Sequence, residues 1–133
     1  MSAVVLDTDV VSYLYKQHSL AKAYASILAG HRLYISFMTV AELHKGMYWA
    51  GWDNERTLRM EAALQAYTVI QSSGELCRAW GWVRFQRKPR PISTEDAWIA
   101  ATALLHDCFL ATHNDADYTG IPGLRLLIPN PRA

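Results

Sequence analysis

The chain has 133 residues, of which 51% are hydrophobic and 19% charged, and this composition excludes an intrinsically disordered chain. The formal net charge is +1, which by itself indicates neither a nucleic-acid-binding protein nor its opposite. No apolar run approaches the roughly 18 residues of a membrane helix, and no signal segment precedes the first apolar run, so we expect a cytoplasmic protein with no membrane contact.

The first predicted element is the short apolar run Val4–Leu6, which is typical of a strand buried on both faces of a parallel sheet. Asp7 follows where this strand ends. Thr8 or Asp9 is expected to cap a helix that continues to about residue 15.

The rest of the chain continues this alternation of strands and helices. Its first part is predicted to contain a helix at 19–29, a strand at 33–35, a helix that Ser36 or Thr39 caps and Gly51 ends, and a helix at 54–66 behind the cap Asp53. Its second part is predicted to contain a strand at 68–70, a helix from Ser72 or Ser73 to the break at 88–91, a helix that opens at 93–96, and strands at 108–111 and 124–128.

Strands that alternate with helices predict a three-layer α/β/α fold with a mainly parallel sheet of four to five strands and right-handed crossovers. No linker, repeat or low-complexity segment interrupts the pattern. We therefore expect residues 1–133 to form a single domain.

Four acids occupy comparable places in this pattern. Asp7 follows the first strand, Glu42 begins the helix after the second strand, and Asp117 lies beyond the fourth strand. In a parallel sheet the carboxyl ends of the strands share one edge, so these three side chains can converge there. Asp96 opens a helix that precedes a strand, and the same rule alone would place it at the opposite edge.

Carboxylates gathered in one pocket repel one another and raise each other's pKa unless a cation is present. Their hard oxygen atoms suit Mg²⁺, with Mn²⁺ as an alternative. Such ions can activate a water molecule and stabilise the leaving oxygen in the cleavage of a phosphodiester. For each acid the alternative is local: Glu42 and Asp96 can stabilise the N-terminus of their own helix, and Asp117 can be an ordinary turn residue.

Five sequence blocks resemble the PIN-domain ribonucleases, with the greatest likeness to the VapC toxins of bacterial toxin–antitoxin pairs. The blocks cover nearly the whole chain, in order and spacing: VLDTD at 5–9, TVAEL at 39–43 with Gly46, DAWIAATA at 96–103, ATHNDADY at 111–118 and IPGLR at 121–125. The resemblance implies a PIN-like nuclease fold and a Mg²⁺-dependent endoribonuclease that cleaves transfer or ribosomal RNA and thereby inhibits translation.

The resemblance also implies particular residues. The acids that bind metal and carry catalysis would be Asp7, Glu42, Asp96 and Asp117. The side chains expected to support them are Thr8, Thr112, Asn114 and Asp115. The family fold brings the helix opening at Asp96 to the active edge. Asp9 and Asp115 are extra acids, and the motif does not fix which role each of them has.

A stretch without acids lies between Glu75 and Glu95, and it carries basic side chains next to aromatic ones. Such a strip suits RNA phosphates and unstacked bases. The residues predicted to bind RNA are Arg84, Arg87, Lys88 and Arg90. The alternative is a helix with a solvated basic face and with Trp80 in the core.

Apolar side chains also gather near the end of the third predicted helix, at Met47, Tyr48, Trp49 and Trp52. They can belong to the core or form an apolar groove for a partner helix. The family resemblance implies a VapB-type antitoxin, whose C-terminal segment covers the active site, and a homodimer.

Two other functions remain open from the sequence. An apolar strand followed by Asp7-Thr8-Asp9 also describes a haloacid-dehalogenase-like phosphatase, in which Asp7 would be the nucleophile. That alternative predicts a lysine before a late pair of acids and gives Glu42 no role. A domain that binds RNA or protein without turnover is the non-enzymatic alternative.

Overall fold

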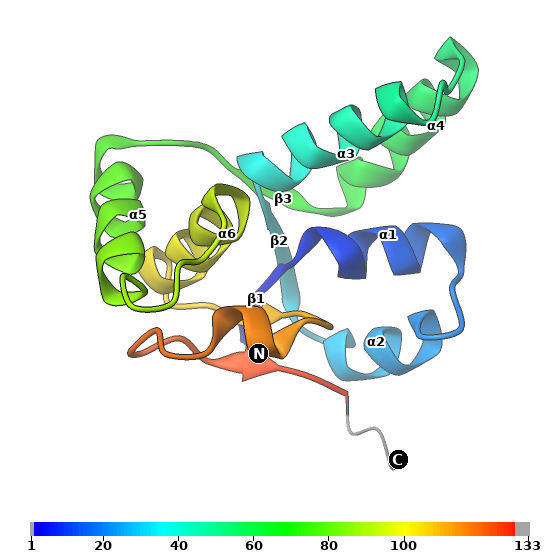
Figure 1. Ribbon diagram of the computed structural model, residues 1–133. Coiled ribbons are helices and arrows are strands. Elements are labelled where there is room, and N and C mark those ends of the chain that lie inside the picture. Colours follow the sequence, from blue (N-terminus) through cyan, green and yellow to red (C-terminus); the bar gives the residue numbers. More distant parts are fainter. Residues whose placement is uncertain (1, 130–133) are drawn as a thin grey trace.

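The computed structural model describes residues 2–129, and a five-stranded parallel sheet runs through its centre (Figure 1). The strands are β1 (Ala3–Leu6), β2 (Arg32–Ser36), β3 (Thr68–Ile70), β4 (Phe109–Ala111) and β5 (Leu126–Leu127). Their spatial order is β3-β2-β1-β4-β5, and every neighbouring pair is parallel. The predicted parallel α/β class is confirmed.

Six α-helices connect these strands. They are α1 (Thr8–Lys16), α2 (Ala21–Leu28), α3 (Phe37–Trp49), α4 (Asn54–Ala63), α5 (Gly74–Gln86) and α6 (Thr94–Leu105). None of the helices in residues 2–129 has both the length and the apolar character needed to cross a membrane. Two short 3₁₀ turns complete the structure, at Leu64–Ala66 (η1) and Asp115–Tyr118 (η2).

The helices cover the two faces of the sheet in separate groups (Figure 1). The crossovers from β1 to β2 and from β2 to β3 move in one direction along the sheet, and their helices α1 to α4 pack on one face. The crossover from β3 to β4 moves back past β1, so a right-handed connection places α5 and α6 on the other face.

Strand β1 is the centre of both cores. Val4, Val5 and Leu6 are all completely buried. Because side chains alternate across a strand, Val5 belongs to the core under α5 and α6, whereas Val4 and Leu6 belong to the core under α1 to α4. This arrangement explains why the run is apolar throughout and holds the residue after it, Asp7, in a fixed position.

Several boundaries differ from the prediction. The helix predicted at 54–66 ends at Ala63 and continues as η1, and the strand predicted at 124–128 is reduced to Leu126–Leu127. The expected caps Ser36, Asp53 and Ser73 are confirmed, since each side chain accepts a hydrogen bond from its helix's first turn. The first helix is confirmed as α1, but its cap was predicted wrongly: the N-cap is Asp7, because Asp7 keeps an extended backbone and accepts a hydrogen bond from the Thr8 amide.

Helices α5 and α6 form a hairpin that decides where Asp96 lies. The two helices pack along each other, and the turn between them is held by bonds from Trp80 Nε1 to the Thr94 carbonyl and from Arg84 to the Ile92 carbonyl. Ser93 caps α6 by accepting a hydrogen bond from the amide of Asp96. This hairpin returns the first turn of α6 to the carboxyl edge of the sheet, as the family resemblance implied and the simple strand rule did not.

Candidate active site

The site lies between β1 and β4, where the crossovers leave the sheet in opposite directions. Open α/β sheets bind ligands at such a point, outside the carboxyl ends of the strands. The two strand ends are joined directly here, because the Asp7 amide donates a 2.8 Å hydrogen bond to the Ala111 carbonyl. Asp7 and Thr112 therefore leave the sheet side by side.

Asp7 is 5% exposed, and both of its carboxylate oxygens accept hydrogen bonds. Its Oδ1 accepts from the Thr8 amide at 2.8 Å. Its Oδ2 accepts from the Thr112 hydroxyl at 2.8 Å and from the Tyr118 hydroxyl at 3.0 Å. Thr112 Oγ1 in turn accepts from the amide of Asn114 at 3.0 Å, so the loop after β4 is tied to the same carboxylate.

Tyr118 links Asp7 to Asp96. Its hydroxyl lies 3.0 Å from Oδ2 of Asp7 and 3.2 Å from Oδ1 of Asp96, and its side chain is 2% exposed. A phenol carries one proton, so it can donate to only one of the two carboxylates at a time. The tyrosine holds the two acids on either side of one oxygen atom.

Glu42 is held in the site by a pair of threonines. The Thr8 hydroxyl donates to Oε1 of Glu42 at 2.7 Å, and it lies 3.0 Å from the hydroxyl of Thr39, which is completely buried. Because Thr8 uses its single proton on Glu42, Thr39 donates to Thr8. The chain of hydroxyls fixes the direction of the Glu42 carboxylate from the first turn of α1.

Asp9 enters the site, although the sequence suggested only a helix-start residue. Its Oδ2 accepts a 2.8 Å hydrogen bond from Nδ2 of Asn114. Its Oδ1 is buried and has no hydrogen-bond partner among the described residues. A buried carboxylate oxygen without a partner is costly, which indicates a position where a cation or a water molecule binds.

The electrostatics of the site favour a cation. Burial, and then the charge of Asp9, raise the pKa of Asp7 from 3.8 to about 7. Burial is also the largest cause that raises the pKa of Asp9, Glu42 and Asp96. No lysine or arginine in residues 2–129 forms a salt bridge with any of these carboxylates. A positive ion would relieve both the burial and the mutual repulsion.

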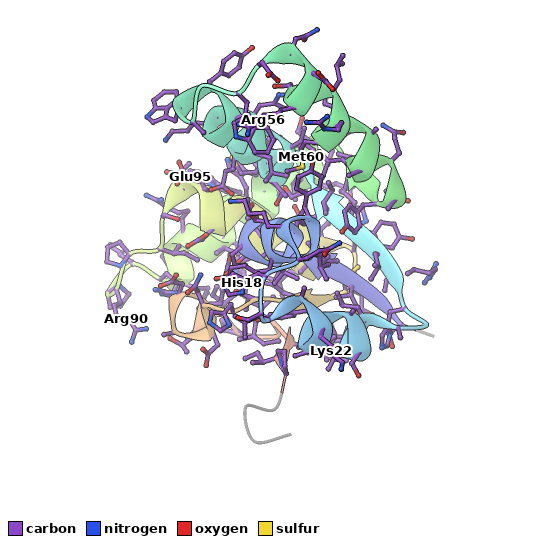
Figure 2. All side chains as sticks on the ribbon, turned by 90° about the vertical axis from the view of Figure 1, so that its right-hand side faces the viewer. His18, Lys22, Arg56, Met60, Arg90 and Glu95 are labelled. Atoms are coloured by element: carbon purple, nitrogen blue, oxygen red, sulfur yellow. The ribbon has the colours of Figure 1, made fainter. Side chains whose placement is uncertain are left out.

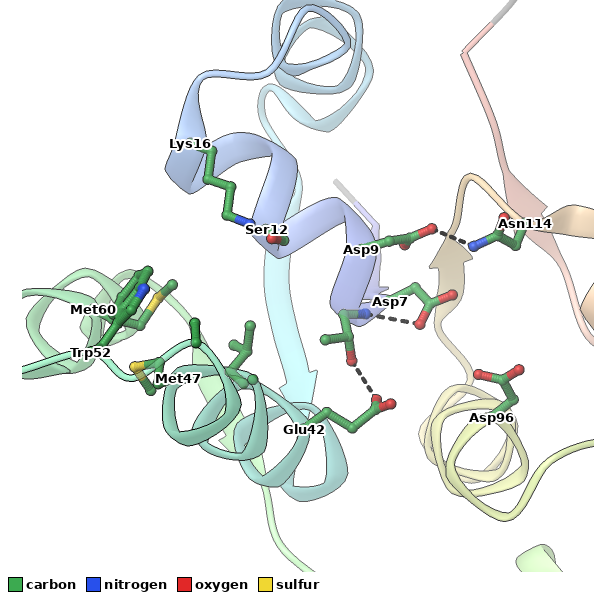
Figure 3. Close-up of a pocket in the computed structure, with 14 residues that line it drawn as sticks. Asp7, Asp9, Ser12, Lys16, Glu42, Met47, Trp52, Met60, Asp96 and Asn114 are labelled. Carbon is green, nitrogen blue, oxygen red and sulfur yellow. Dashed lines mark hydrogen bonds between the residues drawn. The ribbon is translucent and has the colours of Figure 1, made fainter. Parts of the chain in front are cut away.

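The acids surround a hollow of about 450 Å³ (Figure 3). Of the residues predicted to form the site, the hollow is lined by Asp7, Thr8, Glu42, Asp96 and Asn114. Thr112 lies behind Asp7 and is completely buried. Asp115 and Asp117 are exposed on η2 and do not line the hollow, although the charge of Asp117 raises the pKa of Asp96.

The oxygen atoms around the hollow suit a hard cation that keeps part of its hydration shell better than a cation held by protein ligands alone. Within the described part of the chain, no three His, Cys, Asp or Glu side chains form a group that could hold a metal ion by themselves. Mg²⁺ commonly keeps several water molecules and binds through one or two carboxylates. The carboxylates around the hollow, with the unpartnered oxygen of Asp9 among them, fit that requirement.

The predicted basic strip is largely occupied by internal contacts. Arg87 was predicted wrongly as an RNA contact, because its side chain is 6% exposed and its guanidinium donates to the carbonyls of Arg90 and Asp117. Arg90 donates hydrogen bonds to the Ala116 carbonyl and to the Thr119 hydroxyl. The loop that carries Arg90 lies far from Arg56 and Met60 of α4 (Figure 2).

The other two basic residues differ from Arg87. Arg84 bonds to Ile92 and Thr94 and lies over the ring of Trp80, 5.4 Å from its centroid. Lys88 is exposed on the loop that also carries Arg90. Together the arginines of this loop fasten α5 to η2, and an RNA contact by Arg84, Lys88 or Arg90 stays a prediction.

The apolar group at the end of α3 is divided. Met47 is core, at 5% exposure, whereas Tyr48 and Trp49 are 79% and 80% exposed. Trp52 is half-buried and lines the hollow together with Met47 and Met60, at the end away from the acids (Figure 3). Core packing thus explains Met47 but not Tyr48 or Trp49.

Sequence reasoning missed two groups in the site. Tyr118 was visible only as part of a motif, and no local pattern signals that its hydroxyl reaches two acids. Lys16 and Ser12 also line the hollow, from the face of α1 that Asp9 shares. Helical spacing could have revealed these two, because residues 9, 12 and 16 follow one another at intervals of three and four.

Comparison with known proteins gives concordant results. The PIN domain family matches residues 4–124. Ribonuclease VapC1 of Haemophilus influenzae (strain R2866) is 32% identical over 126 residues, which cover 91% of this chain and 93% of that protein.

Two solved structures are similar over nearly their full lengths. VapBC-1 from nontypeable Haemophilus influenzae has a TM-score of 0.77 and 32% identity, covering 95% of this chain and 97% of that one. VapBC2 from Rickettsia felis, bound to a DNA fragment from their promoter, has a TM-score of 0.83 at 23% identity, covering 96% and 99%, and supports the fold.

Proposed function

The chain belongs to the PIN domain family and, within it, to the VapC ribonucleases, and from this premise we propose that it is a divalent-metal-dependent endoribonuclease. Its cation would be Mg²⁺, with Mn²⁺ as a substitute. We propose further that it is the toxin of a VapBC-type pair, which cleaves transfer or ribosomal RNA and inhibits translation until an antitoxin neutralises it.

The observation that carries the proposal is the group of carboxylates around one hollow, at the carboxyl ends of β1 and β4, that form no salt bridge with a basic side chain of residues 2–129. Asp7, Glu42 and Asp96 would hold the cation, with Asp117 acting from the rim near Asp96. When bound, a divalent cation supplies a water molecule of lowered pKa and offsets negative charge at the phosphate.

The remaining residues of the site position these acids. Thr112 and the Thr8 amide orient the Asp7 carboxylate, and Tyr118 sets its separation from Asp96. The Thr8 hydroxyl aims Glu42 into the hollow. Fixed carboxylates favour catalysis because the site needs little rearrangement when the phosphodiester arrives.

We propose that residues 1–133 act as one nuclease domain, that the protein works in the cytoplasm where its RNA substrates are, and that it forms a homodimer. The antitoxin assignment is supported by the similarity to VapBC complexes. Co-purification with a tagged VapB-type protein encoded beside this chain tests the partner. Sedimentation of the isolated chain tests the homodimer.

The phosphatase alternative loses its support. That alternative gives Glu42 no role, whereas Glu42 lines the same hollow as Asp7 and is held there by the Thr8 hydroxyl. The match to the PIN domain family covers the residues on which that alternative rested.

The decisive experiment incubates the metal-stripped protein with total RNA, with and without Mg²⁺ or Mn²⁺, and maps the new RNA ends by sequencing. We expect defined fragments only with a cation.

Asp96→Asn and Glu42→Gln should each reduce cleavage at least 100-fold, on the order expected for loss of a group that stabilises the transition state. Glu75→Gln is the matched control, since Glu75 is exposed on α5 and lies outside the hollow. Full cleavage by Asp96→Asn would refute the assignment, and binding of RNA without cleavage would favour the non-enzymatic alternative.

A further inference from the structure

Two hollows flank the same stretch of helix α3. The first is the hollow of the candidate active site, of about 450 Å³. The second, of about 470 Å³, is lined by Met38, Ala41, Glu42, Lys45, Gly46, Trp49 and Glu95. Glu42 and Gly46 line both, so the two hollows meet across one turn of α3.

Each hollow contains one tryptophan and one lysine. Trp52 and Lys16 line the first, at the end away from the acids (Figure 3). In the second, Lys45 Nζ lies 5.4 Å from the centroid of the Trp49 ring. Trp49 is 80% exposed, so its ring adds little to the core and is available for contact. Each indole has a cation near its ring, Lys45 beside Trp49 and Arg56 at 5.9 Å from the centroid of Trp52. An indole face with a nearby cation suits an unstacked base and its phosphate.

Gly46 lies between the two hollows and lines both of them. Glycine is among the poorest helix formers, yet Gly46 lies inside the helix Phe37–Trp49. Packing does not require it, because a Cβ built at Gly46 has no other atom within 4 Å. Gly81 of α5 has the same open surroundings, so Gly46 is distinguished by its place between the two hollows and not by being a glycine in a helix.

The charges permit a nucleic acid on this path. Lys16 and Lys45 lie in the two hollows, and the acids Glu42 and Glu95 lie between and beside them. The carboxylates would repel phosphate unless the cation of the proposed function is present, whereas the lysines attract it throughout.

We propose that a single strand of RNA crosses α3 at Gly46, with one unstacked base against Trp52 and a second against Trp49, while Lys16 and Lys45 contact phosphates. This RNA path rests on the proposed ribonuclease function and deepens it, because it predicts an unpaired substrate such as a loop. Stacking on an aromatic face accepts every base, so the path selects single-stranded character rather than sequence.

The test measures binding of a fluorescein-labelled 12-nucleotide RNA of mixed sequence by fluorescence anisotropy, in Ca²⁺, with a gel to show that the RNA stays intact. Trp49→Leu and Trp52→Leu should each weaken binding roughly 5- to 100-fold, the loss expected when one stacked base is released. Gly46→Leu should weaken it at least tenfold because the new side chain occupies the crossing. A 12-base-pair duplex of the same sequence should bind the wild type more weakly than the single strand.

Two matched controls lie outside both hollows. Gly81 is a helical glycine whose Cβ would also meet nothing within 4 Å, and Tyr48 is 79% exposed and lines neither hollow. Gly81→Leu and Tyr48→Leu should bind RNA within twofold of the wild type. Lys16→Ala and Lys45→Ala are exposed changes that keep the fold. Each should reduce the slope of log affinity against log salt by about 0.7.

The outcomes separate the RNA path from the proposed function. A wild type that binds the RNA through these residues but cleaves none with Mg²⁺ or Mn²⁺ would contradict the nuclease function and support the path. A wild type that cleaves RNA while every variant binds normally would overturn the path alone, as would equal losses in Gly46→Leu and Gly81→Leu. Normal RNA binding by all variants is the result expected if a protein partner, rather than RNA, occupies this face.

Discussion

Replacing Asp7 by asparagine should stabilise the metal-free protein at pH 8. The folded protein raises the pKa of Asp7 from 3.8 to about 7, chiefly through burial. The stability that the protonated form provides is therefore complete below about pH 4 and is lost as the pH rises to about 7. At about 1.4 kcal/mol per pH unit, the ionised carboxylate costs about 4 kcal/mol above pH 7, and the wild type should lose about 2–3 kcal/mol between pH 5 and pH 8.

Asparagine removes this charge but also weakens some of the contacts to Thr8, Thr112 and Tyr118. Two lost hydrogen bonds cost about 1–3 kcal/mol together, so we expect a net gain of about 1–3 kcal/mol at pH 8 and almost no difference at pH 5. Urea unfolding in EDTA at both pH values measures the difference. Added Mg²⁺ should stabilise the wild type more than Asp7→Asn, because the variant lacks one of the three carboxylates proposed to hold the cation.

Asp115→Asn serves as the matched control, because Asp115 is exposed and lies outside the hollow. Its stability should follow the wild type at both pH values. A wild type whose stability is constant from pH 5 to pH 8, or an Asp7→Asn variant that is less stable than the wild type at pH 8 in EDTA, would refute the reasoning.

Three other predictions concern residues around the acids. Tyr118→Phe keeps the buried ring but removes the hydroxyl that lowers the pKa of Asp7 and Asp96. In the same urea series, the pH at which the metal-free protein loses stability should therefore move upward. An unchanged pH midpoint of this stability loss would contradict the role of the hydroxyl. Arg87→Met should cost about 1–3 kcal/mol of unfolding free energy, because two backbone carbonyls lose their buried donor, while the salt dependence of RNA binding stays the same. Lys88→Glu should leave stability within about 0.5 kcal/mol and weaken RNA binding with a shallower salt slope if the exposed loop contacts RNA; anisotropy titrations at several salt concentrations decide.

The sequence was sufficient for the strands and for most of the site because both depend on short-range patterns. An apolar run such as Val4–Leu6 is typical of a strand covered on both faces, and the residue that follows such a strand emerges at the carboxyl edge. This reasoning places Asp7 and Glu42 without knowledge of the packing. Asp96 needed the family resemblance, since only the α5–α6 hairpin explains its position.

The errors arise where a side chain acts on a distant part of the chain. Arg87 belongs to a basic cluster in the sequence, but its guanidinium is used by the Asp117 carbonyl 30 residues later. Tyr118 appears in a turn, and its hydroxyl reaches Asp7 across 111 residues. Charge and periodicity describe neighbours along the chain, so they cannot reveal which long polar side chains are consumed by tertiary contacts.

The acids that reduce stability are also the ones that would bind the cation, and these two effects have the same physical origin. The raised pKa of Asp7 and the unpartnered oxygen of Asp9 both reflect negative charge that the protein itself does not neutralise. Every part of that repulsion which a cation relieves contributes to the affinity for the cation. A substitution that relieves it by other means, such as Asp7→Asn, must therefore gain stability and lose cation affinity together. The packing of the completely buried strand at Val4–Leu6 offsets the destabilising charge of these acids in the metal-free protein.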